Sequence, residues 1–143
     1  MTFAVLGAGA FGSALAIALA RGGKEVMLWG RSSDHMRLMQ SSRQNQKYLG
    51  DAQFPDSLSA THDLRKACQK EVIFLAVPMQ QLSALLSKIE TNLDAKVLIA
   101  CCKGIDLSTV QGSTGIIKQL APRAEAAILT GPSFASDLSL IHI

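Results

Sequence analysis

The sequence predicts a doubly wound α/β fold, in which helices cover both faces of a parallel sheet. Two observations lead to this class. Five short apolar runs, rich in Val, Ile, Leu and Ala, do not alternate with polar residues, which is typical of strands buried on both faces. Segments with helical spacing separate them, and strand–helix alternation favours a parallel sheet with right-handed crossovers. The predicted strands are Thr2–Leu6, Glu25–Trp29, Val72–Val77, Lys96–Cys101 and Ala126–Thr130.

The spacing of apolar residues predicts helices between these strands. Phe11, Leu15 and Leu19 recur every four residues after the first strand, and Gly22-Gly23 follows them as a pair that commonly ends a helix. Residues 41 to 61 have a weaker pattern and indicate a loop, marked by Tyr48-Leu49-Gly50 and Phe54-Pro55. The remaining predicted helices begin at Ser33 (with Met36 and Met39), at Asp63, at Gln80 (with Leu82, Leu85, Leu86 and Ile89) and at Ser113.

Composition indicates one globular domain and argues against several classes of protein. Of the 143 residues, 48% are hydrophobic, which is enough to build a core. The net charge is +3, and the Lys and Arg residues are spread along the chain, so we expect no binding of nucleic acid. The beginning of the chain does not resemble a signal peptide, and no apolar run approaches the roughly 18–20 residues of a membrane span. We therefore expect a cytoplasmic protein without membrane insertion.

The cysteines favour reduced thiols over disulfides or a metal site. There are three of them, Cys68, Cys101 and Cys102, and an odd number with two adjacent members is a poor disulfide framework. No Cys-x-x-Cys or Cys/His cluster has the spacing of zinc ligands, so we expect no metal. Buried, reduced thiols agree with the cytoplasmic location.

The first chemical motif is Gly7-Ala8-Gly9-Ala10-Phe11-Gly12, between the first predicted strand and the first helix. In this context the first glycine permits a tight turn, the second lets a pyrophosphate approach the backbone, and the third lets helix and strand pack closely. The free N–H groups and the dipole of the helix N-terminus attract phosphates. The motif predicts a Rossmann-type dinucleotide site; the alternative is a glycine-rich packing turn.

The end of the second predicted strand bears on the choice of cofactor. An acidic residue about 20 positions after the glycine motif would bind a ribose 2′-OH and favour NAD. This chain has Arg31 there, followed by Ser32 and Ser33. A guanidinium attracts a 2′-phosphate, so we favour NADP over NAD. The alternative is a solvated surface arginine.

Three further segments follow predicted strands and can join the same site. Val77-Pro78 shapes the loop after the third strand, and Lys103 follows the fourth as a cation for a phosphate or hydroxyl. Gly131 and Ser133, after the fifth strand, offer close backbone approach and a hydroxyl donor. Separately, these could be a strand end, a surface lysine and a Gly-Pro turn. Together they are expected at one edge, because the carboxyl ends of parallel strands share it and ligands bind there.

Taken in order, the segments resemble the N-terminal half of bacterial NAD(P)-dependent glycerol-3-phosphate dehydrogenases. The resemblance covers residues 2 to about 138. Its most specific part is the set Trp29-Gly30-Arg31, Lys103-Gly104-Ile105 and Gly131-Pro132-Ser133-Phe134-Ala135 after the Rossmann start. The other matching segments are Val5 to Ala16, Leu28, Tyr48-Leu49, Phe54-Pro55 and Ala76-Val77-Pro78.

The resemblance implies reversible hydride transfer between NAD(P)H and dihydroxyacetone phosphate, giving sn-glycerol 3-phosphate for glycerophospholipid synthesis. A homodimer of the full-length enzyme stays open. Lys103 would contact cofactor and substrate, and Gly131 and Ser133 the substrate. With the motif glycines included, the expected cofactor residues are Gly7, Gly9, Ala10, Phe11, Gly12, Arg31, Tyr48, Pro78, Lys103 and Ala135.

The chain departs from the family pattern at its end. Family members continue into an all-helical second domain that carries the general acid/base lysine, so we expect no catalytic residue within these 143 residues. We assign 1–138 to the cofactor domain and interpret 139–143 as a truncated or non-native tail. The fragment is expected to bind cofactor without full activity. The alternatives are another NADP-dependent reductase of a small keto or hydroxy acid and a nucleotide-binding module without catalysis.

Overall fold

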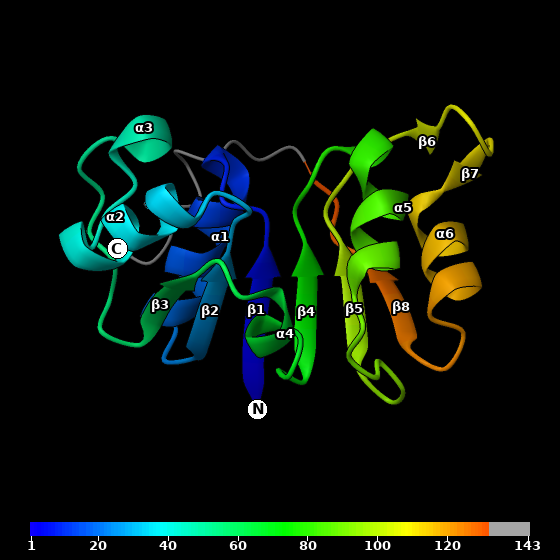
Figure 1. The fold of residues 1–143 in the computed structure, drawn as a ribbon, viewed down its shortest axis with the longest axis horizontal. Coiled ribbons are helices and arrows are strands. Elements are labelled where there is room, and N and C mark those ends of the chain that lie inside the picture. The colour runs from blue at the N-terminus through cyan, green and yellow to red at the C-terminus, as the bar shows by residue number, and fades with distance from the viewer. Residues whose placement is uncertain (132–143) are drawn as a thin grey trace.

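The computed structural model describes residues 1–131 and contains a six-stranded sheet in the order β3-β2-β1-β4-β5-β8 (Figure 1). All neighbouring strands of this sheet are parallel. The order runs outward in both directions from β1, which confirms the predicted doubly wound Rossmann-type class. The strands are β1 (Thr2–Leu6), β2 (Glu25–Trp29), β3 (Leu58–Thr61), β4 (Val72–Leu75), β5 (Val97–Ala100) and β8 (Glu125–Ile128).

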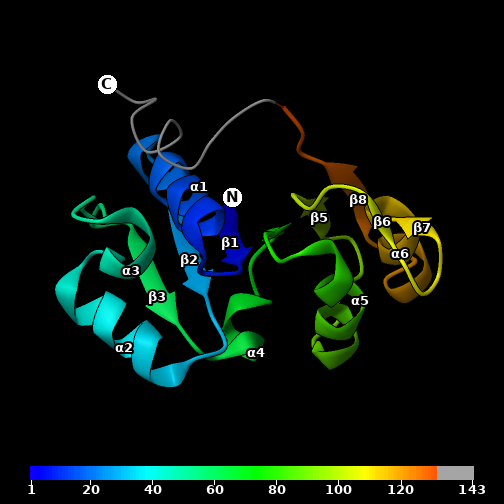
Figure 2. The same ribbon diagram turned by 90° about the horizontal axis from the view of Figure 1, so that it is seen from above.

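Helices cover both faces of the sheet, and Figure 2 shows α1 on the face opposite to α4 and α5. Side chains alternate across a strand, so Ala4 and Leu6 of β1 pack into one core cluster while Phe3 and Val5 pack into the other. The first cluster includes residues of α4, α5 and α6, and the second includes residues of α1 and α2. The helices are α1 (Ala10–Arg21), α2 (Ser33–Ser42), α3 (Gln46–Leu49), α4 (Leu64–Ala67), α5 (Met79–Lys88) and α6 (Ser113–Leu120).

The prediction of a loop over residues 41 to 61 is wrong in part: Phe54-Pro55 lies outside any helix or strand, but the rest of the segment is not all loop. It contains the four-residue helix α3 and the strand β3, which pairs with β2 at one end of the sheet. Only Leu58 of β3 is buried, and the strand reads Leu-Ser-Ala-Thr. An edge strand with a partly exposed, polar sequence lacks the continuous apolar run by which the central strands were predicted.

The other differences are small. Three predicted strands are shorter or shifted by one or two residues, as β4, β5 and β8 show. A two-stranded antiparallel hairpin of β6 (Ile105–Asp106) and β7 (Gln111–Gly112) was not predicted. Its strands are two residues long, too short to produce a hydrophobic period.

No helix in the described part of the chain is long and apolar enough to cross a membrane. Within residues 1–131, no group of three or more His, Cys, Asp or Glu side chains is arranged to hold a metal ion. All three cysteines are free thiols, with Cys68 and Cys102 buried and Cys101 half-buried.

Candidate functional site

The carboxyl ends of the parallel strands lie at one level. The register pairs Leu6 with both Trp29 and Leu75, and Ala100 with both Leu75 and Ile128. The chain therefore leaves the sheet along one edge after each of these strands. The segments that were predicted to follow strands all start at this edge. They contain the glycine motif, Arg31, Pro78, Lys103 and Gly131.

A cleft of about 540 Å³ opens at this edge beside the point where the strand order reverses. Its walls come from the loops after β1, β2 and β4, from α3 and from one side of α5. The lining residues are Gly7, Ala8, Gly9, Trp29, Gly30, Arg31, Tyr48, Ala76, Val77, Pro78, Gln81, Ala84, Leu85 and Lys88.

Two glycines of the motif are required by packing. A Cβ at Gly7 would stand 2.1 Å from the Ala76 carbonyl oxygen, and the residue has φ of +123°, which side-chain-bearing residues rarely adopt. A Cβ at Gly12 would stand 1.8 Å from the Gly7 oxygen. The loop after β1 is thus pressed against the loop after β4 and against the first turn of α1.

Gly9 differs from both, because a Cβ built there would meet nothing within 4 Å. Gly9 is the N-cap residue of α1, and the first bond of the helix runs from the Ser13 N–H to its carbonyl. The N–H groups of the first turn have no partner within the helix and carry its positive dipole end. The open space over Gly9 and these donors fit the pyrophosphate of a dinucleotide.

A buried asparagine holds the glycine loop from the other side. Asn45 is fully buried, and its Nδ2 donates to the Ala8 carbonyl at 3.1 Å and to the Ser13 hydroxyl at 2.8 Å. Its Oδ1 lies 3.3 Å from His35 Nε2, and the His35 ring lies 6.0 Å from that of Tyr48. The α2–α3 connection, predicted only as a loop, therefore fixes one side of the glycine loop.

The cleft is electrostatically one-sided. Among the described residues that line it, only Arg31 and Lys88 carry charge, and both are cationic. The Trp29 indole is anchored by a 3.1 Å hydrogen bond that its Nε1 donates to the His62 carbonyl. A cationic cleft without a lining carboxylate favours an anionic ligand.

The structure gathers some predicted site residues and leaves others apart. It places Gly7, Gly9, Arg31, Tyr48 and Pro78 in the cleft lining. Ala10, Phe11 and Gly12 form the start of α1 but are not among the lining residues. Lys103 and Gly131 are exposed after β5 and β8, outside the lining, and Ser133 and Ala135 lie outside the described residues.

The segment after Lys103 is docked on α5 by a well-connected hairpin. Gln80 Nε2 donates to the Ile105 carbonyl at 2.9 Å, and its Oε1 accepts from the Leu107 N–H at 3.0 Å. The Asp106 carboxylate accepts from the Ser108 hydroxyl at 2.7 Å and from the Thr109 hydroxyl and N–H. The side-chain bonds of Ser108 and Thr109 lower the pKa of Asp106.

The cysteines are poor nucleophile candidates. Burial raises the pKa of Cys101 to about 12, with Cys102 adding to the effect, and raises the pKa of Cys68 to about 11. Burial also raises the pKa of Cys102. Thiols with such values stay protonated at neutral pH, and the thiolate is the reactive form.

Sequence reasoning missed the wall that α5 contributes. Gln81, Ala84, Leu85 and Lys88 stand at i, i+3, i+4 and i+7 and therefore share one side of the helix. The spacing was visible in the sequence. That this side borders the cleft depends on how α5 packs on the sheet.

Comparison with known proteins agrees with this geometry. Residues 2–143 match the family described as NAD-dependent glycerol-3-phosphate dehydrogenase N-terminus. The chain is 47% identical over 140 residues to the NAD(P)+ glycerol-3-phosphate dehydrogenase of Ruegeria sp. (strain TM1040), covering 98% of this chain and 43% of that protein. It is 40% identical over 139 residues to the corresponding protein of Roseobacter denitrificans, covering 97% of this chain and 43% of that protein.

A solved structure gives the same picture. The crystal structure of glycerol-3-phosphate dehydrogenase from Coxiella burnetii superposes with a TM-score of 0.87 at 28% identity, covering 97% of this chain and 43% of that one. The chain thus spans less than half the length of the relatives that it matches. The family match over nearly the whole chain and the identity to these relatives show that the chain belongs to the NAD-dependent glycerol-3-phosphate dehydrogenase family, of which it matches the N-terminal part.

Proposed function

We propose that this chain is the cofactor half of an enzyme that transfers a hydride reversibly between NAD(P)H and dihydroxyacetone phosphate, yielding sn-glycerol 3-phosphate for glycerophospholipid synthesis. The observation that carries the proposal is the cleft over Gly9, beside the N-terminus of α1. The nicotinamide supplies the hydride, and the chain's residues supply position and electrostatics. Family membership favours this substrate over other small keto or hydroxy acids.

The proposed cofactor residues are those predicted from the motifs. Gly7, Gly9 and the start of α1 would hold the pyrophosphate, and Arg31 the adenosine end, with Tyr48 and Pro78 on the cleft walls. Lys103, Gly131 and Ser133 would face the substrate. The proposed domain is 1–138. Because the chain spans 43% of its relatives, we propose that these residues bind cofactor and that full activity needs the rest of the enzyme.

We propose NADP as the preferred cofactor, since Arg31 follows β2 and no carboxylate is among the described lining residues. Arg31→Asp should weaken NADPH binding by about 2–3 kcal/mol and NADH binding much less, because it removes a charge-assisted contact and adds repulsion. Calorimetric titration of the purified chain measures both affinities. Arg123→Asp makes the same charge change outside the cleft lining and should alter neither. Equal weakening of NADPH and NADH by Arg31→Asp would remove the NADP preference.

Catalysis is tested by a fusion. The 143 residues alone should bind NADPH saturably and leave it unoxidised when dihydroxyacetone phosphate is added. Fused to the C-terminal part of the Ruegeria sp. relative, they should oxidise it. A fusion that oxidises NADPH only with a small keto acid would favour another reductase, and a fusion that binds tightly without turnover would favour a nucleotide-binding module.

A further inference from the structure

We propose that Lys88, the last residue of α5, is a second contact for the 2′-phosphate of NADP and sets cofactor selectivity together with Arg31. This inference rests on the proposed cofactor function and adds a residue that the motifs do not contain. Lys88 stands out because it lines two clefts at once, the cofactor cleft and a neighbouring one of about 470 Å³.

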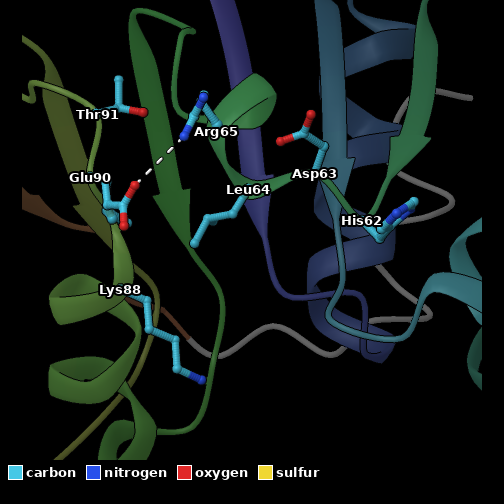
Figure 3. Close-up of a pocket in the computed structure, with 8 residues that line it drawn as sticks. His62, Asp63, Leu64, Arg65, Lys88, Glu90 and Thr91 are labelled. Carbon is cyan, nitrogen blue, oxygen red and sulfur yellow. Dashed lines mark ion pairs between the residues drawn. The ribbon is translucent and has the colours of Figure 1, made fainter.

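The neighbouring cleft lies between α4 and the end of α5 (Figure 3). Its lining residues are His62, Asp63, Leu64, Arg65, Lys88, Ile89, Glu90 and Thr91. Since Lys88 is the residue that both linings share, its side chain stands where the two clefts meet. Lys88 therefore borders the same cleft as the glycine loop and Arg31.

The direction of the side chain agrees with that position. Helical side chains lean toward the N-terminus of their helix, so Lys88 leans over the turn that holds Ala84 and Leu85, which also line the cofactor cleft. In Figure 3 the Lys88 side chain extends away from Glu90 and in the direction in which the green β4 arrow runs, toward the carboxyl edge of the sheet.

The charges around Lys88 leave its ammonium uncompensated. Glu90, the nearest carboxylate along the chain, pairs with Arg65 at 3.6 Å, as the dashed line in Figure 3 shows. Asp63 uses Oδ1 to accept the Lys66 N–H at 3.2 Å, as the N-cap of α4. Within residues 1–131, the Lys88 side chain makes no hydrogen bond or ion pair. A lysine in this state is available to an anionic ligand.

A structural role offers a competing explanation. A cation in the last turn of a helix interacts favourably with the helix dipole, and Lys88 occupies that turn. That role affects folding stability and does not distinguish NADPH from NADH. The two explanations therefore differ in their readout: a dipole effect changes unfolding, whereas a phosphate contact changes the ratio of NADPH to NADH affinity.

The experiment compares Lys88→Gln, Lys88→Arg and the matched control Lys118→Gln, which removes an exposed cation from the last turn of α6. Calorimetry with NADPH, NADH, adenosine 2′,5′-bisphosphate and 5′-AMP gives four affinities for each variant. Lys88→Gln should weaken both 2′-phosphorylated ligands about five- to tenfold and the other two less than about twofold. Lys88→Arg should retain most of the affinity, because it keeps the charge, and Lys118→Gln should match wild type.

Two results would overturn the assignment and leave the proposed function standing. One is an unchanged NADPH affinity in Lys88→Gln. The other is equal weakening of all four ligands, which would assign Lys88 to the 5′-phosphate that they share. Failure of wild type to bind any of them, in a sample that is folded by circular dichroism, would instead overturn the proposed function and this inference with it.

Discussion

At the residue scale, the first two glycines of the motif have different roles: Gly7 is required for packing, whereas Gly9 leaves space for a ligand. Stability and nucleotide affinity can separate these roles. Gly9→Ala should lower the melting temperature only slightly: its Cβ enters open space and its φ of −78° suits alanine, although alanine is a weaker N-cap than glycine. The methyl group would occupy the space proposed for the pyrophosphate, so NADPH and NADH should both bind about tenfold or more weakly. Thermal unfolding and calorimetry on one sample give both quantities.

Gly7→Ala is the matched comparison. Its Cβ would collide with the Ala76 carbonyl, and its positive φ is strained for alanine, so the variant should lose more than about 2 kcal/mol of unfolding free energy. A Gly9→Ala protein that binds both nucleotides like wild type would leave the motif as a packing turn, the alternative raised from the sequence.

Two of the motif glycines, Gly7 and Gly12, could be predicted from the sequence because the backbone geometry there leaves no room for a side chain. Gly7 needs a positive φ and Gly12 must lie close to the Gly7 carbonyl, so only glycine fits at either position and the sequence pattern reveals it. No comparable backbone requirement marks Asn45 or Lys88 in the sequence. Asn45 acquires its role only when the α2–α3 connection folds back against Ala8 and Ser13.

At the scale of elements, the Asp106 carboxylate contributes to holding the β6–β7 turn, and this contribution depends on pH. Hydrogen bonds from Ser108 and Thr109 hold the pKa of Asp106 below the unfolded value of about 3.9. Ionised Asp106 therefore stabilises the fold above that pH, and the contribution disappears as pH falls through the folded pKa. Asp106→Asn should lower the unfolding free energy at pH 7, and its difference from wild type should shrink below pH about 4.

Urea unfolding of wild type and Asp106→Asn across this pH range provides the measurement. Asp51→Asn is the control, since Asp51 is exposed and outside the hairpin. A difference between Asp106→Asn and wild type that stays constant from pH 7 to 3 would show that the carboxylate charge does not hold the hairpin.

Strands were predictable where the sequence contains a continuous apolar run. β1 and β2 match the predicted bounds, and residues 3–6 of β1, residues 26–28 of β2 and every residue of β4 are buried. β3 was not predicted because three of its four residues are only partly buried at the edge of the sheet, so the strand has no continuous apolar run. The helix α3 has four residues, fewer than two helical turns, and so cannot display a helical period.

At the scale of the whole molecule, topology brings distant segments to one place. The sequence alone predicted that the segments after five strands would share an edge, because parallel strands with right-handed crossovers all end on the same side. The register confirms this edge. Sequence could not predict which segments meet in one cleft, because that depends on the strand order. β1 and β4 are neighbours, whereas β5 and β8 carry Lys103 and Gly131 away from the glycine loop.

The same topology leaves apolar surface at one end of the molecule. Leu107 and Val110 of the β6–β7 turn are 76% and 74% exposed, and Ile128 of β8 is 53% exposed. Within residues 1–131, β8 is the last strand of the sheet, so its outer edge offers unpaired backbone groups as well. Exposed apolar side chains beside an open strand edge are a surface for association.

We therefore expect the 143-residue chain to self-associate, with a weight-average mass in sedimentation velocity that rises with protein concentration. Leu107→Lys with Val110→Lys should reduce the association, because two charges would have to be desolvated at the contact. Leu38→Lys is the control, since Leu38 is 63% exposed on α2, at the other end of the sheet order. If Leu38→Lys reduced the association as much as the double variant, the contact would not be specific to the β6–β7 and β8 end. A wild type that stays monomeric at high concentration would contradict the expected self-association itself. A reduction confined to the double variant would locate the association there, on the side of the sheet away from Arg31.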